Sequence, residues 1–78
     1  MAPDNITVRV SARGPLRKYV TAEEAEIPRS STASALVSFY RVPAEHHVIV
    51  IKDGKRLSPT SELHDGDSVI LITMMSGG

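Results

Sequence analysis

The sequence predicts a small α+β domain in which a mixed sheet of four to five strands packs on one main helix. Residues 6–10 alternate apolar and polar side chains, which is the period of a half-buried strand. From Ala33 onward, apolar residues recur at helical spacing and indicate an amphipathic helix. Two largely β-branched runs, Val48–Ile51 and Val69–Ile72, are apolar at every position and favour strands in the middle of a sheet. The predicted order is strand, strand, helix, strand, short strand, strand.

The first two strands are expected to form a hairpin. Gly14-Pro15 marks a turn, and the second strand lies within Lys18–Ile27. Val20 and Ala25 do not keep a strict period of two, so this strand has a bulge or a late start. Pro28 ends it. The residues expected to face the core are Ile6, Val8, Val10, Val20, Ala25 and Ile27.

The helix is expected over roughly Thr32–Arg41. The hydroxyl side chains of residues 30–32 are N-cap candidates, because they can accept hydrogen bonds from the first free N–H groups. Pro43 closes the helix, since the residue before a proline avoids helical angles. Phe39 lies off the apolar stripe and is expected at the helix edge. The stripe itself consists of Ala33, Leu36, Val37 and Tyr40.

Two turns organise the second half of the chain. Asp53-Gly54 between apolar runs predicts a tight hairpin turn, after which Leu57 heads a short strand. Residues 58–62 are predicted to form a loop, and the Leu63 side chain is expected to pack into the core. Asp65-Gly66-Asp67 then turns the chain into the last strand.

The two apolar strands have more apolar surface than one short helix can cover. If Val50, Val69 and Leu71 face the helix, the alternate side chains face away from it. Alternatively, both strands are central in a larger assembly that covers both faces. Either arrangement implies a partner protein. The predicted partner-binding face consists of Ile49, Ile51, Ile70, Ile72 and Met74.

Composition excludes several classes of function. Nine basic residues balance nine acidic ones, so the net charge offers no electrostatic footprint for nucleic acid or an anionic membrane. Four cations near each other in sequence, at positions 9, 13, 17 and 18, are interpreted as solvated surface. The chain has no cysteine, hence no disulfide and no thiol nucleophile. Met1–Asn5 has no apolar core of signal-peptide length, and a cytoplasmic location is expected.

No catalytic or metal-binding residue is predicted. His46 and His47 are adjacent, and neighbouring residues on a strand point to opposite faces, so they cannot readily share one ion. His64, Asp65 and Asp67 are interpreted as solvated turn residues. The chain shows no phosphate-binding glycine loop or nucleophile elbow, so no bound cofactor is expected either.

The last three residues differ from the strand before them. Residues 1–75 are predicted to form the domain, and Ser76-Gly77-Gly78 a flexible tail. Such an arm reaches about 10 Å, and its glycines have no Cβ, so a narrow protein channel could admit it. The tail is therefore interpreted as a carboxylate delivered into another protein's active site. An ordinary frayed terminus is the alternative.

These features together resemble a known family. The order of elements, the turn Lys52-Asp-Gly-Lys-Arg-Leu57, the turn Leu63-His-Asp-Gly-Asp67 and the ending Met75-Ser-Gly-Gly78 resemble the β-grasp sulfur carriers and ubiquitin-like proteins. The likeness is to the ThiS/MoaD family, including the prokaryotic ubiquitin-like modifiers. It covers nearly the whole chain and is most specific from Val48 onward. Thr73-Met-Met75 stands where molybdopterin-type members often carry prolines, so no subfamily is assigned.

The resemblance implies a β-grasp fold, with the first and last strands adjacent and parallel at the centre of the sheet. It also implies that a ubiquitin-activating-type adenylyltransferase uses ATP to adenylate the Gly78 carboxylate, with Gly77 as the required preceding glycine. A sulfur donor then gives a thiocarboxylate for cofactor biosynthesis or tRNA thiolation, or a protein amine is acylated. The chain would be the substrate of this catalysis, not the catalyst.

Two alternatives remain open at this point. One is a non-covalent β-grasp interaction module in which the two glycines are incidental. The other is the small subunit of a molybdopterin-synthase-type complex.

Overall fold

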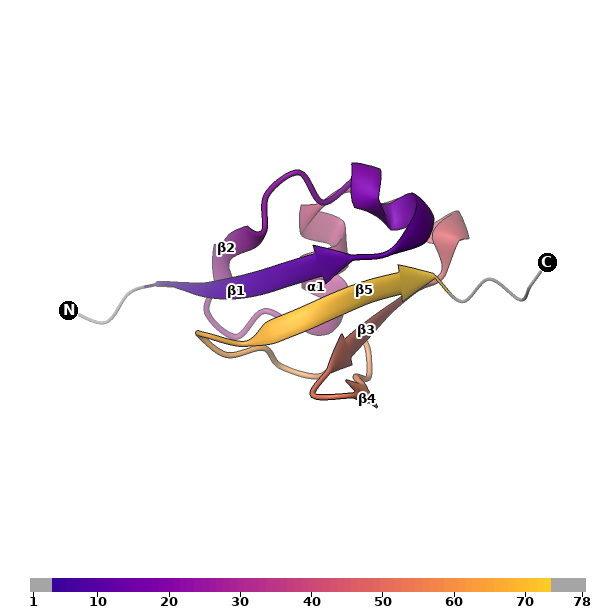
Figure 1. The fold of residues 1–78 in the computed structure, drawn as a ribbon. Helices are drawn as coiled ribbons and strands as arrows, with labels where there is room; N and C mark the ends of the chain where they lie inside the picture. The colour runs from indigo at the N-terminus through magenta and orange to yellow at the C-terminus, as the bar shows by residue number, and fades with distance from the viewer. Residues whose placement is uncertain (1–3, 74–78) are drawn as a thin grey trace.

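A mixed sheet of five strands, covered on one face by a single α-helix, forms the molecule (Figure 1). The structure is a computed structural model that describes residues 4–73, apart from the side chain of residue 44. The strands are β1 (Asn5–Ala12), β2 (Glu24–Pro28), β3 (Val48–Lys52), β4 (Lys55–Arg56) and β5 (Ser68–Thr73). The helix α1 spans Ala33–Phe39, and two short 3₁₀ helices, η1 (Gly14–Lys18) and η2 (Ala44–His46), lie in the connections.

The strand order is β2-β1-β5-β3-β4, so β5 is the central strand. β1 and β5 are parallel, with Arg9 opposite Ser68 and Ala12 opposite Leu71, and their arrows run the same way in Figure 1. The remaining pairs, β1–β2, β3–β5 and β3–β4, are antiparallel. The predicted mixed sheet, with adjacent and parallel first and last strands at its centre, is confirmed.

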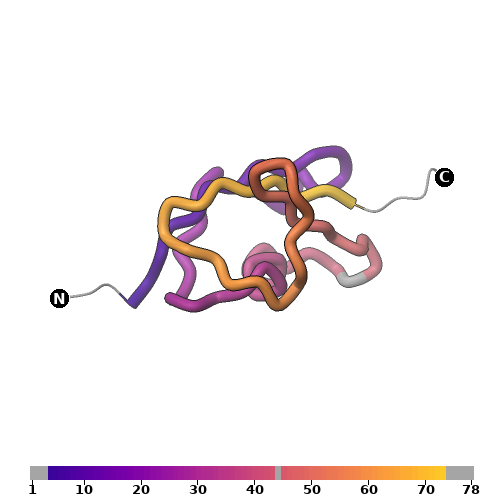
Figure 2. The backbone as a smooth tube through the Cα atoms, turned by 90° about the horizontal axis from the view of Figure 1, so that it is seen from below, coloured from indigo at the N-terminus to yellow at the C-terminus, as the bar shows by residue number. Residues whose placement is uncertain are grey.

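The core lies between the sheet and α1. In Figure 2 the coil of α1 lies on one side and β1 and β5 run along the other, and buried side chains fill the space between them. Every second residue of β1, β2 and β5 points into this layer, as the alternating sequence predicts. The buried residues include Ile6, Val8, Val10, Ala25, Ile27, Ala33, Leu36, Val50, Leu63, Val69 and Leu71.

The connection between β1 and β2 differs from the predicted short turn. Residues 13–23 form a longer link that contains η1, and only Glu24–Pro28 pairs with β1. Gly14 has φ +60 and starts the 3₁₀ turn, in which Leu16 is fully buried. Leu16 anchors the link to the core, which explains why the chain does not fold into a tight hairpin. The late start of β2 is confirmed, and Val20 packs partly buried against the core.

The helix is shorter than predicted because its C-terminus has a defined cap. Thr32 is the N-cap, and its Oγ1 accepts a hydrogen bond from the Ala35 N–H at 3.2 Å. At the other end, the Arg41 N–H donates to Ser38 O at 2.9 Å and the Val42 N–H to Val37 O at 3.5 Å. With φ +57 at Arg41, these bonds form a Schellman motif. Phe39 is 49% exposed, as expected for a residue off the stripe.

The β3–β4 hairpin has the predicted tight turn. Asp53 (φ +52) and Gly54 (φ +77) both lie in the left-handed region, as a two-residue type I′ turn requires. Leu57 does not head a strand, since β4 ends at Arg56. Its N–H nevertheless donates to Val50 O at 2.8 Å, which continues the hairpin pairing by one bond.

The turn before β5 is built by its two carboxylates. Asp65 Oδ1 accepts the Thr7 N–H at 2.8 Å, and Asp67 Oδ2 accepts the His64 N–H at 2.8 Å. The Lys52 ammonium lies 3.0 Å from Asp67 Oδ1. The side chain of Asp67 is only 11% exposed, so the interpretation of this residue as solvated is wrong. These bonds attach the start of β5 to β1 and β3.

The environment of Asp67 lowers its pKa. Burial acts to raise the pKa, but the His64 N–H and the Lys52 ammonium stabilise the charged carboxylate and outweigh burial, with a smaller contribution from the charge of His64. A group with a lowered pKa in the folded state stabilises the fold above its usual pKa of 3.8, and this contribution is lost as the pH falls through the lower folded value.

We therefore expect Asp67→Asn to lower the free energy of unfolding at pH 7 by about 1–2 kcal/mol. The difference from the wild type should shrink steadily below pH 4, because the wild-type carboxylate is then being protonated. Urea unfolding at pH 7 and pH 3 measures both values, with Glu45→Gln as an exposed control. An equal loss at the two pH values would contradict the role of the charge.

The left-handed backbone at Arg41 makes a second prediction. A Cβ is disfavoured at this φ, so Arg41→Gly should raise the free energy of unfolding by about 0.5–1 kcal/mol. Arg41→Ala removes the same charge but keeps the Cβ, and should bring no such gain. Urea unfolding of the two variants separates the backbone effect from the loss of charge. If Arg41→Ala raised the free energy of unfolding as much as Arg41→Gly, the backbone explanation would be wrong.

Candidate partner-binding face

The face of the sheet opposite α1 carries a compact set of apolar side chains. Val50, Val69 and Leu71 point toward the helix and are buried, so their neighbours in β3 and β5 point the other way. The cross-strand pairs Ile49–Ile72 and Ile51–Ile70 lie side by side in the two central rows of this open face. We call Ile49, Ile51, Ile70 and Ile72 the isoleucine quartet. The expected division of the two strands between two faces is thus observed.

The quartet is half-buried rather than fully exposed. Its members are not among the partly buried residues that pack against the core, so they shield one another on the outside of the sheet. Among the described residues, Phe39 on α1 is the large apolar side chain that counts as exposed. A partner that covered the quartet would gain at most about 1.5–3 kcal/mol for each side chain.

The quartet lies beside the end of β5. Ile72 is the second-last residue of this strand, and Thr73, the last, pairs with Val48. Four residues of the predicted site, Met74, Ser76, Gly77 and Gly78, lie outside the described residues. The described part of the chain therefore ends in the central strand, directly next to the apolar face.

Two of the three histidines, His46 and His64, have local partners. The sequence predicts His46 and His47 on a strand, with their side chains on opposite faces. This placement is wrong, because His46 belongs to η2. Its Nε2 lies 3.2 Å from the Tyr19 hydroxyl, and the two rings meet edge to face. His64 Nε2 lies 3.9 Å from a Glu62 carboxylate oxygen.

Burial raises the pKa of Tyr40, whose hydroxyl donates to Ala22 O at 3.0 Å. Within residues 4–73, no group of three or more acidic, histidine or cysteine side chains is placed to hold a metal ion. No helix in this same range is long and apolar enough to cross a membrane.

Comparison by sequence finds no matching protein-family model and no matching curated protein. Solved structures match in fold. A Pyrococcus furiosus protein assigned as molybdopterin converting factor subunit 1 is 20% identical, with a TM-score of 0.66 over 87% of this chain and 97% of that chain. The ubiquitin of Caldiarchaeum subterraneum is 20% identical, with a TM-score of 0.62 over 95% and 99%. SAMP1 of Haloferax volcanii is 17% identical, with a TM-score of 0.62 over 92% and 99%.

These likenesses establish the fold: the chain has a β-grasp, ubiquitin-like fold. The fold predicted from its resemblance to the ThiS/MoaD and ubiquitin-like proteins is confirmed. Among the structures that it matches are proteins named as a converting-factor subunit, a ubiquitin and a small archaeal modifier protein.

Substitutions at two neighbouring residues of β5 test the two faces of the sheet. Ile72→Asp should leave the domain folded, because this side chain lies on the open face, and should cost about 1 kcal/mol or less. Leu71→Asp places a charge in the core and should unfold the domain. Circular dichroism and urea unfolding distinguish the two. An Ile72→Asp variant as unstable as Leu71→Asp would show that the open face belongs to the core.

Proposed function

We propose that this protein is a carrier whose Gly78 carboxylate is activated by an adenylyltransferase and then loaded with sulfur or joined to an amine. One observation carries the proposal. An apolar face lies on β3 and the central strand β5, and Ser76-Gly77-Gly78 follows the end of β5 after two intervening residues. The likeness in fold to a converting-factor subunit and to ubiquitin-like modifiers supports it.

The chemistry needs an external enzyme. A carboxylate is a poor electrophile, so a Gly78 oxygen must first attack the α-phosphorus of ATP and release pyrophosphate. Hydrosulfide then displaces AMP and loses its proton, so that the terminus becomes a thiocarboxylate. A lysine amine that displaces AMP instead loses a proton and forms an amide. Because its 78 residues include no cysteine, the chain can carry sulfur only at this terminus.

The two parts of the proposed site have separate tasks. The isoleucine quartet docks the chain on the activating enzyme and, after loading, on the sulfur acceptor. Residues 74–78 span from the sheet to the ATP site and can reach at most about 17 Å beyond Thr73. Gly77 keeps the approach slim, because it has no Cβ. A molybdopterin-synthase-type acceptor is one candidate, favoured by the likeness to the Pyrococcus furiosus protein.

We predict that the tail decides activation. Removing Gly77 and Gly78 should abolish ATP–pyrophosphate exchange with the purified activating enzyme from the same organism. Gly77→Val should also fail, because a β-branched side chain widens and stiffens the arm. One residue added after Gly78 should block the reaction. Folding should hardly change in any of these variants, since Leu71 is the last buried core residue within residues 4–73.

Intact-mass spectrometry provides the control and identifies the product. It first shows that Gly78 carries the free carboxylate in the purified chain. After incubation with ATP, enzyme and sulfide, a gain of about 16 Da, the oxygen-to-sulfur difference in atomic mass, marks the thiocarboxylate. If full-length, truncated and extended chains all exchange equally, the terminus is not the reactive group and the proposal is wrong.

A further inference from the structure

We propose that two arginines on opposite flanks of the isoleucine quartet, Arg13 and Arg56, select a protein partner with carboxylates on both sides of an apolar patch. The inference rests on the proposed function for the identity of the partner used in its test. It goes beyond that function because it states which surface chemistry the partner must have.

Arg56 is placed on the open face by the β3–β4 hairpin. It is the cross-strand partner of Ile51, and directly opposed residues in an antiparallel pair have their side chains on the same face. Ile51 in turn is opposite Ile70, so one row of the open face reads Ile70, Ile51, Arg56. Arg56 is exposed and forms the outer end of this row.

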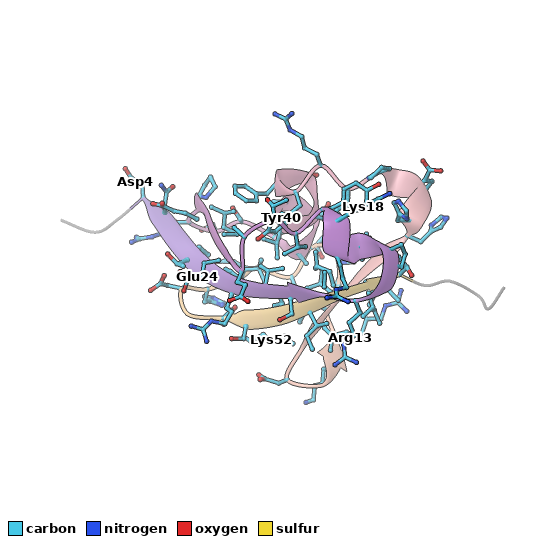
Figure 3. All side chains as sticks on the ribbon, turned by 45° about the horizontal axis from the view of Figure 1, so that its top comes forward. Asp4, Arg13, Lys18, Glu24, Tyr40 and Lys52 are labelled. Atoms are coloured by element: carbon cyan, nitrogen blue, oxygen red, sulfur yellow. The ribbon has the colours of Figure 1, made fainter. Side chains whose placement is uncertain are left out.

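Arg13 flanks the quartet from the other side. Its backbone is extended (φ −125, ψ 154), so it continues the alternation of β1 past Ser11 on the open face and Ala12 on the core face. Its N–H donates to Leu71 O at 3.1 Å. Since Ala12 is opposite Leu71, Arg13 comes next to Ile72. Figure 3 labels Arg13 near the β5 and β3 strands.

The register fixes the spacing of the two cations. From β1 to β4 there are three strand-to-strand steps of about 4.8 Å, and the two arginines differ by one two-residue step along the strands. Their Cα atoms are therefore about 16 Å apart, with the quartet between them. Carboxylates on a partner must be spaced to match.

Two other cations of the sheet have a local counter-charge, whereas these two arginines, like Lys55 of β4, have none among the described residues. Arg9 lies 3.8 Å from Glu24, and Lys52 is held by Asp67 at 3.0 Å. Within residues 4–73, no acidic side chain lies within 4.0 Å of the charged groups of Arg13 or Arg56. Their positive charge is thus available to an incoming surface, in a chain whose net charge is zero.

The charges also disfavour a second copy as the occupant. A symmetric dimer through this face would gather two copies of each arginine around one apolar centre, and these like charges would repel. A partner with an apolar centre and acidic flanks satisfies both parts of the surface. Charged flanks mainly speed association and exclude wrong partners, while the apolar centre supplies affinity.

The test uses charge reversal with a matched control. Arg13→Glu with Arg56→Glu changes the net charge by the same amount as Arg29→Glu with Arg41→Glu, whose positions follow the edge strand β2 and the helix α1, away from the quartet. Titration calorimetry measures the Kd of each full-length chain for the purified activating enzyme at 50 and 300 mM NaCl. We expect the first pair to weaken binding about tenfold at low salt and to flatten the salt dependence, with little effect of the control pair.

Other results would overturn either this inference or the proposed function. If both arginine pairs behave alike while Ile70→Asp abolishes binding, the flanks select nothing and this inference fails, although the proposed function stands. If every variant binds normally but the truncated tail still exchanges, the proposed function fails. A wild-type dimer in sedimentation equilibrium that Ile70→Asp dissociates would make a second copy the occupant and overturn the inference. Binding to vesicles with 30% anionic lipid, but not to the enzyme, would overturn it in favour of a membrane.

Discussion

The parallel pairing of β1 with β5 is the constraint on which the rest of the structure depends. It places β5 between two neighbours, so this strand has no free edge and two usable faces. Val69 and Leu71 then supply the core, while Ile70 and Ile72 supply the open face. The same strand connects the apolar face to the residues that follow Thr73. If β5 lay at the edge of the sheet, the middle of the apolar face would no longer be on the strand that continues into the residues after Thr73.

Parallel strands cannot be joined by a tight turn, so the chain must return to the start of β1 from a distance. The Asp65–Asp67 turn makes this return: one carboxylate accepts the Thr7 N–H, and the other holds the turn closed and binds Lys52 of β3. Charge-assisted hydrogen bonds are stronger than neutral ones, which suits a turn that must fix the register of the central strand. The turn Leu63–Asp67, which contributes to the family resemblance, is therefore explained by the hydrogen bonds and the ion pair that it makes.

Local periodicity was sufficient to predict most of the fold, because each strand face and the helix stripe repeat within a few residues. Asp53-Gly54 predicted its turn since few residue pairs accept two left-handed conformations. Leu16 was missed because a single apolar residue in a polar stretch has no period. The buried role of Asp67 depends on Lys52, which is distant in sequence, and the placement of Arg13 and Arg56 about one face follows only from the strand register. No local pattern carries information of that kind.

In the proposed function, the surface that docks (the isoleucine quartet) and the group that reacts (the Gly78 carboxylate) are separate. The short chain between them determines how strongly docking raises the local concentration of the carboxylate. Once the quartet is bound, Gly78 is confined within about 17 Å of Thr73. One carboxylate in a sphere of that radius corresponds to an effective concentration on the order of 0.1 M. The ATP site therefore needs little intrinsic affinity for a diglycine, which has almost no side-chain surface to recognise. Selectivity must then reside in the sheet face, where isoleucines give contact area and unpaired arginines exclude partners of the wrong charge.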